Sequence, residues 1–192
     1  MKTIELSQKL RHQMENVLTE ERFDHTLGVA YTAASMAFIH GEDVQKALTA
    51  GMLHDCAKCI SHEERLAICK KHEIEVTDIE LRNPSLLHAK VGAWMAEHEY
   101  EVTDPEILSA IRWHTTGRPA MTTLDKIIFT ADFIEPNRKN LQHMDEIRKE
   151  AYTDLDTCVR HILHDTLIYL QTIGNECDPM TQQTYDYYKG AF

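Results

Sequence analysis

The chain has 192 residues, of which 43% are hydrophobic and 27% charged, and this length and composition fit one globular domain rather than two. It contains only seven glycines and five prolines, which argues against an all-β sandwich with many turns and favours long helices. A net charge of -11 makes nucleic acid and anionic membranes poor partners, because both repel an acidic surface.

The N-terminal segment and the cysteines lead us to expect a soluble, cytoplasmic protein. Charged side chains interrupt the first 17 residues and leave no room for the apolar core of a signal peptide. No window reaches the ~18 apolar residues that a membrane-spanning helix needs. The five cysteines are an odd number in a chain large enough to form a core without disulfides, so we expect reduced thiols.

Apolar residues at helical spacing predict a succession of helices and no convincing strand. Asn83-Pro84 and Asp104-Pro105 mark two helix starts, because Asn and Asp cap helices and proline suits the first turn. The segments 115–119 and 136–140 are predicted loops, and 74–82 shows no clear period. The predicted helices are 3–18, 20–39, 43–57, 61–72, 85–98, 106–114, 123–135, 141–150, 154–173 and a short tyrosine-rich one that starts at 178.

Twelve histidines are well above ordinary usage, and several fall on inward faces of these helices. The candidate inward-facing groups are His25, His54, Asp55, His88, His114 and Asp132. A buried imidazole or carboxylate must be paired or bound to a metal. Taken singly, each histidine is better explained as a core residue that hydrogen-bonds a backbone carbonyl. Together the six groups favour a shared metal centre, in which Asp55 is well placed to bridge two ions.

Two other features have metal-like spacing but receive a different interpretation. His164-Asp165, with His161 before it, lies mainly opposite the apolar stripe of its helix and is predicted to be a solvated face. Cys56 and Cys59 have the spacing of redox and zinc motifs, but no second cysteine pair and no preceding strand accompany them, so we interpret them as small core residues.

Lys58 follows His54 by four residues and Asp55 by three, so its side chain overhangs the same helical face. One interpretation is a charge that takes part in the shared centre of His54 and Asp55. The other is a cation at the C-terminal end of the helix, which stabilises the helix dipole by a few tenths of a kcal/mol.

The order His25, His54-Asp55, Asp132 resembles the HD-domain metallophosphohydrolase superfamily, whose ligands are His, His-Asp and Asp. Within it the chain is similar to the bacterial YqeK-type symmetrical bis(5'-nucleosyl)-tetraphosphatases. The segments that carry this resemblance are ERFDHTLGV (21–29), LHDCAK (53–58), HAKVG (88–92), HTTGR (114–118) and ADFIEPNR (131–138). One departure is Cys56, where an aliphatic residue is usual, and it leaves the ligands untouched.

The resemblance implies a single all-α domain, the HD-domain helical bundle, that hydrolyses diadenosine tetraphosphate at its middle bridge to two ADP. It also implies iron, as one or two ions. Imidazole and carboxylate ligands suit manganese, cobalt, nickel or zinc as substitutes and do not suit magnesium. Such a metal binds phosphate oxygens and lowers the pKa of bound water towards ~7.

The resemblance also implies roles for individual residues. The implied metal ligands are His25, His54, Asp55, Asp132, His88 and His114, the last two of which would complete a second metal site or contact a phosphate. The implied catalytic residues are Asp55 and Lys58. The implied substrate-binding residues are Lys58, His88, His114, Thr115, Arg118 and Arg138.

The expected organisation is an N-terminal helix (1–19) packed on an HD hydrolase domain (20–173), followed by a tyrosine-rich helix (174–192). Expected partners are a dinucleoside polyphosphate and its ADP product, with a second copy of the chain as a candidate and no nucleic acid or membrane. Two alternatives stay open: another HD-domain nucleotidase or phosphodiesterase, and a non-catalytic HD module that binds nucleotides as a sensor.

Overall fold

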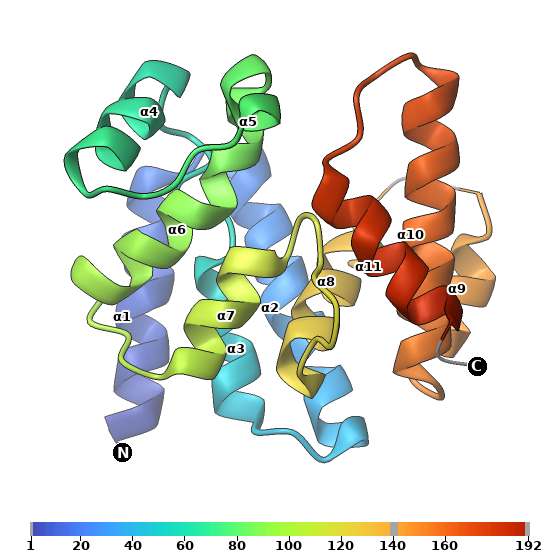
Figure 1. Ribbon diagram of the computed structural model, residues 1–192. Coiled ribbons are helices and arrows are strands. Elements are labelled where there is room, and N and C mark those ends of the chain that lie inside the picture. Colours follow the sequence, from blue (N-terminus) through green and yellow to red (C-terminus); the bar gives the residue numbers. More distant parts are fainter. Residues whose placement is uncertain (1, 139–141, 191–192) are drawn as a thin grey trace.

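The computed structural model describes residues 2–138 and 142–190, and within them the chain is helical without any strand (Figure 1). The predicted all-α fold is confirmed. The helices are α1 (Lys2–Val17), α2 (Glu20–His40), α3 (Val44–Leu53), α4 (His62–Lys71), α5 (Asp78–Arg82), the 3₁₀ helix η1 (Pro84–Leu86), α6 (Leu87–His98), α7 (Pro105–Trp113), α8 (Thr123–Ile134), α9 (Met144–Glu150), α10 (Leu155–Thr172) and α11 (Pro179–Gly190). None of the described helices is long and apolar enough to cross a bilayer.

Side-chain caps explain where most of these helices begin. Thr19, Asp43 and Ser61 each accept a hydrogen bond from a backbone N–H of the first turn, and the predicted cap Asp104 does the same for α7. Thr122 forms a capping box with Asp125 at the start of α8. Such local bonds satisfy amide groups that have no partner within the helix.

Four helix starts or ends differ clearly from the prediction. Asn83 makes no side-chain cap bond, and after it the 3₁₀ helix η1 precedes α6, which begins only at Leu87. A capping box between Thr77 and Glu80 starts the short helix α5 inside the segment that shows no period. Helix α9 begins at Met144, and residue 141, its predicted start, lies outside the described residues. Helix α3 ends at Leu53 instead of continuing through Ala57, and His54 and Asp55 lie in the turn that follows.

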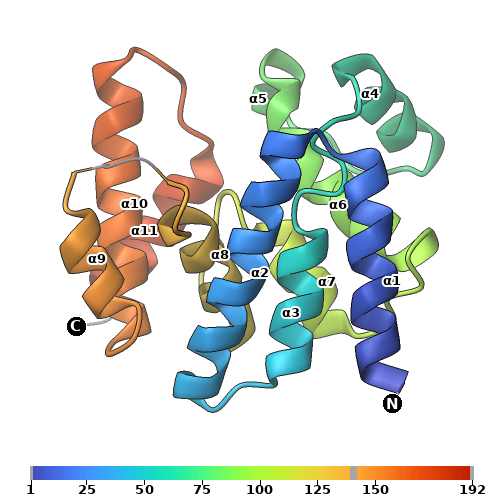
Figure 2. The same ribbon diagram turned by 180° about the vertical axis from the view of Figure 1, so that it is seen from behind.

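The helices form one bundle around a shared core. Helix α2 contacts α3 and α8, and α7 contacts α3, α6 and α8. Both views place α1 beside α3 on one flank and α9, α10 and α11 beside α8 on the other (Figures 1 and 2). Leu10 and Met14 of α1 and Tyr188 of α11 are buried in the same core cluster, so both terminal helices are packed onto the bundle.

A close approach between helices brings α3 against α2. A Cβ atom on Gly51 would lie 2.7 Å from Cα of Ala30, so only glycine fits at this position. Val29, Ala30, Ala33, Ala47 and Ala50 are fully buried around the crossing. The small residues thus bring His25 of α2 close to the end of α3, where His54 and Asp55 follow.

Candidate metal centre

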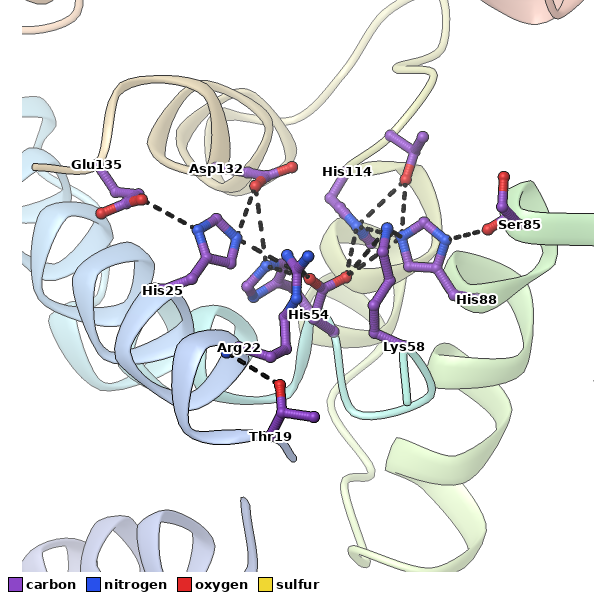
Figure 3. Close-up of polar contacts among 12 residues, drawn as sticks. Thr19, Arg22, His25, His54, Lys58, Ser85, His88, His114, Asp132 and Glu135 are labelled. Atoms are coloured by element: carbon purple, nitrogen blue, oxygen red, sulfur yellow. Dashed lines mark hydrogen bonds and ion pairs between the residues drawn. The ribbon is translucent and has the colours of Figure 1, made fainter. Parts of the chain in front are cut away.

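Five segments bring the six predicted ligands into one cluster. His25 comes from α2, His54 and Asp55 from the end of α3 and the turn after it, His88 from the start of α6, His114 from the end of α7 and Asp132 from α8. The side chains of the four histidines and of Asp132 converge (Figure 3). Their assembly from helices far apart in sequence is what the inward faces predict.

One half of the cluster gathers around Oδ2 of Asp55. This oxygen lies 3.6 Å from Nε2 of His54 and 3.9 Å from Nε2 of His25. Oδ1 of Asp132 lies 3.0 Å from Nε2 of His25 and 3.9 Å from Nε2 of His54. Two imidazoles and two carboxylates therefore face one another at separations typical of ligands around a single ion.

The other half gathers around the second oxygen of the same carboxylate. Oδ1 of Asp55 lies 3.2 Å from Nε2 of His88 and 3.6 Å from Nε2 of His114. Asp55 thus presents one oxygen to each pair of histidines, as expected of a carboxylate that bridges two ions.

The backbone fixes the orientation of three of these rings. Nδ1 of His54, His88 and His114 lies 2.7, 2.6 and 2.7 Å from the carbonyl oxygen three residues earlier in each case. Because a carbonyl only accepts, Nδ1 must carry the proton and donate it. In the neutral ring Nε2 then has a free lone pair, and this nitrogen faces the cluster.

The same contact explains why α3 stops early. If the helix continued, the carbonyl of Gly51 would accept the N–H of Asp55, but the ring of His54 occupies that carbonyl. The chain turns instead, with Lys58 N–H bonded to the Asp55 carbonyl. A helix C-terminus without glycine or proline is therefore built by the ligand itself.

Glu135 orients the fourth ring and was not predicted to take part. Its Oε1 accepts a hydrogen bond from Nδ1 of His25 at 3.1 Å, which turns Nε2 towards Asp132. A carboxylate behind a ligand imidazole is the usual support of a metal-binding histidine. The signal in the sequence was the position of Glu135 within the segment 131–138, one turn after Asp132.

The unmatched lone pairs in this cluster fit a cation. Among the described residues, Nε2 of His54 and Oδ1 of Asp55 are buried and make no hydrogen bond. Nε2 of His88 and Nε2 of His114, whose Nδ1 protons are committed to carbonyls, lie 3.0 Å apart. Acceptors that face acceptors are stable only with positive charge between them, and a nitrogen and oxygen donor set of this kind suits a transition metal.

Burial keeps His54 and His88 unprotonated and therefore able to bind metal, because it lowers the pKa of each to about 4. His25 differs: burial alone would lower its pKa, but the carboxylates of Asp132 and Glu135 outweigh burial and raise it. Burial alone would raise the pKa of the Asp55 carboxyl, but the imidazoles of His54, His114 and His88 outweigh that effect and hold it well below its ordinary value. Neutral imidazoles and ionised carboxylates are the forms that coordinate metals.

Three cations lie at the edge of the cluster. Lys58 has its Nζ 3.2 Å from Nε2 of His88 and 3.9 Å from Oδ1 of Asp55. Arg138 donates to Oδ1 of Asp132 at 2.6 Å. Arg22, which was not predicted to take part, donates to Oδ2 of Asp55 at 2.9 Å, and its position one turn before His25 was its only signal. Their side chains are about one-third exposed, so they border the open side of the cluster.

Comparison with known proteins identifies this arrangement. The family model of the HD domain matches residues 22–137, the segment from Arg22 to the loop after Asp132. The chain belongs to the HD domain family. HD domains bind divalent metals, and we call the cluster of His25, His54, Asp55, His88, His114 and Asp132 the HD centre.

Two relatives with a known activity are similar over most of their length. The symmetrical bis(5'-nucleosyl)-tetraphosphatase of Bacillus subtilis strain 168 is 41% identical over 170 residues, which are 88% of this chain and 90% of the relative. The enzyme of the same name from Staphylococcus aureus is 38% identical over 165 residues, 85% of this chain and 84% of the relative.

A solved structure shares the whole fold. It is a predicted HD superfamily hydrolase involved in NAD metabolism from Clostridium acetobutylicum, with a TM-score of 0.93 and 37% identity. The match covers 96% of this chain and 97% of that one. The predicted HD-domain bundle is therefore confirmed beyond the segment that the family model matches.

Thr115 and Arg118, the two remaining predicted substrate-binding residues, differ in their position relative to the HD centre. Oγ1 of Thr115 lies 3.3 Å from Nε2 of His88 and 3.2 Å from Nε2 of His114, so this hydroxyl joins the HD centre. Arg118 binds Asp125 at the start of α8 through two nitrogens, at 2.7 and 3.1 Å. No ion pair in the described part of the chain joins Arg118 to the HD centre.

A cavity of about 650 Å³ adjoins the HD centre at Thr115. Its walls come from α5, from the end of α7 and from the segment between α10 and α11. Trp113 contributes an aromatic side chain, and Met180 and Gln183 contribute part of the C-terminal wall. A volume of this size can hold a nucleoside.

The sequence features interpreted as unrelated to the HD centre lie outside it. Cys56 is buried, as predicted, with its thiol 3.5 Å from the carbonyl of Gly92. Cys59 is exposed, so the prediction that it is a core residue is wrong. His164 is half-exposed. His161 and Asp165, by contrast, are only 21% and 14% exposed, so the predicted solvated face is wrong for these two residues.

Proposed function

We propose that the chain hydrolyses dinucleoside tetraphosphates at the central phosphoanhydride and converts diadenosine tetraphosphate to two ADP. The observation that carries this proposal is the HD centre, in which Asp55 joins two histidine pairs and three cations border the open side. The similarity to symmetrical bis(5'-nucleosyl)-tetraphosphatases over most of the chain supports this substrate over others.

The donor set supports one or two iron ions as the cofactor, with manganese, cobalt, nickel or zinc as substitutes. The proposed ligands are His25, His54, Asp55 and Asp132 for one ion, with His88 and His114 for a second. When bound, the metal supplies a Lewis acid for phosphate oxygens and a water of lowered pKa.

The residues around the metal bind and orient the substrate. We assign Lys58 and Arg138 to phosphate oxygens, because both nitrogens lie within 4 Å of the carboxylates of the centre and both side chains are partly exposed. Arg22 joins them on the same geometry. If only one ion binds, His88 and His114 are free to contact a phosphate as well, beside the Thr115 hydroxyl.

We assign one nucleoside of the substrate to the cavity beside Thr115. Trp113 offers a face on which a base can stack. The cavity is lined by Thr115, whose hydroxyl lies beside the histidines assigned to phosphate. In this proposal Arg118 acts indirectly, because its bond to Asp125 holds the loop between α7 and α8 that carries Thr115.

The proposed division of the chain follows these assignments. Residues 20–173 form the HD hydrolase domain, 1–19 the helix packed on it, and 174–192 the tyrosine-rich segment that closes one wall of the cavity. We also propose a cytoplasmic protein, and its net charge of -11 argues against nucleic acid and anionic membranes as partners.

The deciding experiment is an anaerobic assay of iron-loaded protein against dinucleoside polyphosphates and mononucleotides, with products separated by chromatography. We expect ADP as the only product from diadenosine tetraphosphate, with solvent oxygen-18 in its β-phosphate. ATP plus AMP would exclude symmetrical cleavage. Turnover of mononucleotides alone would favour the nucleotidase, and binding without turnover would favour the sensor. Asp55→Asn is the inactive control.

A further inference from the structure

A second group of metal-binding side chains lies between α9 and α10 and shares no residue with the HD centre. His143 immediately precedes α9, and His161 and Asp165 lie one turn apart on α10. One donor atom of each lies within 4.8 Å of the other two. The side chains of His161 and Asp165 are 21% and 14% exposed, so the group is neither a solvated face nor sealed from solvent.

The two imidazole donors flank one carboxylate oxygen of Asp165. Oδ2 of Asp165 lies 2.9 Å from Nδ1 of His143 and 4.0 Å from Nε2 of His161. The ring centroids of the two histidines are 5.2 Å apart. Ligand atoms bound at about 2.0 to 2.2 Å from one ion are separated by distances similar to these two nitrogen-to-oxygen distances.

Glu150 at the end of α9 orients His161 for this role. Its two carboxylate oxygens lie 3.0 and 3.3 Å from Nδ1 of His161, which donates its proton to them. Nε2 of the neutral ring is then a lone-pair donor turned towards Asp165. Glu135 holds His25 in the same way at the HD centre, and this support is typical of metal-binding histidines.

His143 has a backbone conformation that residues other than glycine rarely adopt. Its φ is 59° and its ψ is 13°, in the left-handed region. The ring does not cap α9, although it stands at the capping position, and contacts Asp165 instead. A helix-capping role therefore does not explain this residue, whereas a contact between the two helices does.

We propose that His143, His161 and Asp165 form a second transition-metal site, of the zinc class, that links α9 to α10. Two imidazoles and one carboxylate, with the remaining side open to solvent, suit zinc, cobalt, nickel or copper and do not suit magnesium or calcium. The proposal is independent of the reaction at the HD centre.

Equilibrium dialysis of the untagged protein against micromolar zinc, followed by elemental analysis, tests this site. We expect His161→Ala and Asp165→Asn each to bind one zinc ion per chain fewer than the wild type. His12→Ala, an exposed histidine on α1, is the control and should match the wild type. Equal zinc in all four proteins, or a loss in only one of the two site variants, would overturn the proposal.

Thermal melting gives a second measurement. Zinc should raise the melting temperature of the wild type and of His12→Ala more than that of His161→Ala, because only the former two gain the link between α9 and α10. Asp165→Asn nearly preserves the side-chain shape, so its melting temperature without zinc shows whether the fold is intact. His54→Ala should keep the zinc ion between α9 and α10. This variant therefore distinguishes failure of the second site from failure of the HD centre.

Discussion

Each proposed ligand imidazole of the HD centre is oriented by one hydrogen bond behind it. For His54, His88 and His114 the acceptor is a carbonyl of the same turn, and for His25 it is Glu135. The cluster thus combines local orientation with long-range assembly. Substitutions of ligands and of the cations around them should therefore have separable effects.

Removal of a central ligand should remove the metal. We expect His54→Ala and Asp55→Ala to lose iron after anaerobic reconstitution, because both lie where the two halves of the cluster meet. His164→Ala, half-exposed on α10, is the control and should keep iron at the wild-type level. Elemental analysis of the three variants is the measurement. Equal loss of iron from His164→Ala would show that the wrong His-Asp pair is assigned.

Removal of Lys58 should spare the metal and slow the reaction. Burial lowers the pKa of Lys58, yet an ammonium group 3.9 Å from Asp55 serves better as a charge for phosphoryl oxygen than as a ligand. We expect Lys58→Ala to lower kcat by ~10² to 10³, with a change in unfolding free energy under ~1 kcal/mol. The exposed Lys70→Ala is the control. Normal kcat with full metal content would leave Lys58 as a helix-end cation only.

At the scale of the elements, two crossings position the HD centre. The α2–α3 contact brings His25 to His54, and α7 and α8 bring His114 and Asp132 to the same place. Gly51 controls the first crossing, because its missing side chain is the space into which Ala30 fits.

A methyl group at Gly51 should destabilise the fold. We expect Gly51→Ala to lower the unfolding free energy by about 1 to 3 kcal/mol, since the new Cβ meets backbone rather than a mobile side chain. The same change at Gly92, also inside a helix, places its Cβ 3.5 Å from the nearest atom and should be neutral or slightly stabilising. Urea unfolding of both variants is the measurement, and equal stability would contradict the argument from the crossing.

Helical periodicity could predict most of the helices and the six proposed ligands, but not their local geometry. The faces of the predicted helices selected all of His25, His88, His114 and Asp132, because inward position depends only on spacing. The early end of α3 could not be predicted, since no glycine or proline marks it. Arg22 and Glu135 were missed for a related reason: spacing does not tell which charged side chains fold back onto a ligand.

At the scale of the whole molecule, the acidic chain must bind a polyanion. The net charge of -11 repels a tetraphosphate at long range, so attraction has to come from the metal and from Arg22, Lys58 and Arg138 close to it. Salt should therefore screen repulsion as well as attraction.

Metal binding should stabilise the whole fold, because the acceptors of the HD centre face one another without it. Metal at about 100 times its dissociation constant contributes about 2.7 kcal/mol, which is roughly 5 to 10 °C in melting temperature for a chain of this size. We expect chelation to lower the melting temperature by that amount and iron or manganese to restore it. Magnesium, which avoids imidazole ligands, should not restore it. The control is His54→Ala, whose melting temperature should respond less to the chelator.

The early end of α3 has a consequence for the order of events during folding. The bond from the His54 ring to the Gly51 carbonyl spans three residues, as do the bonds of His88 and His114, so it can form as soon as its own turn does. The imidazoles are then already oriented before the helices pack together, and helix packing sets only the distances between the imidazoles. A metal ion that arrives at this stage meets imidazoles whose orientation is already set.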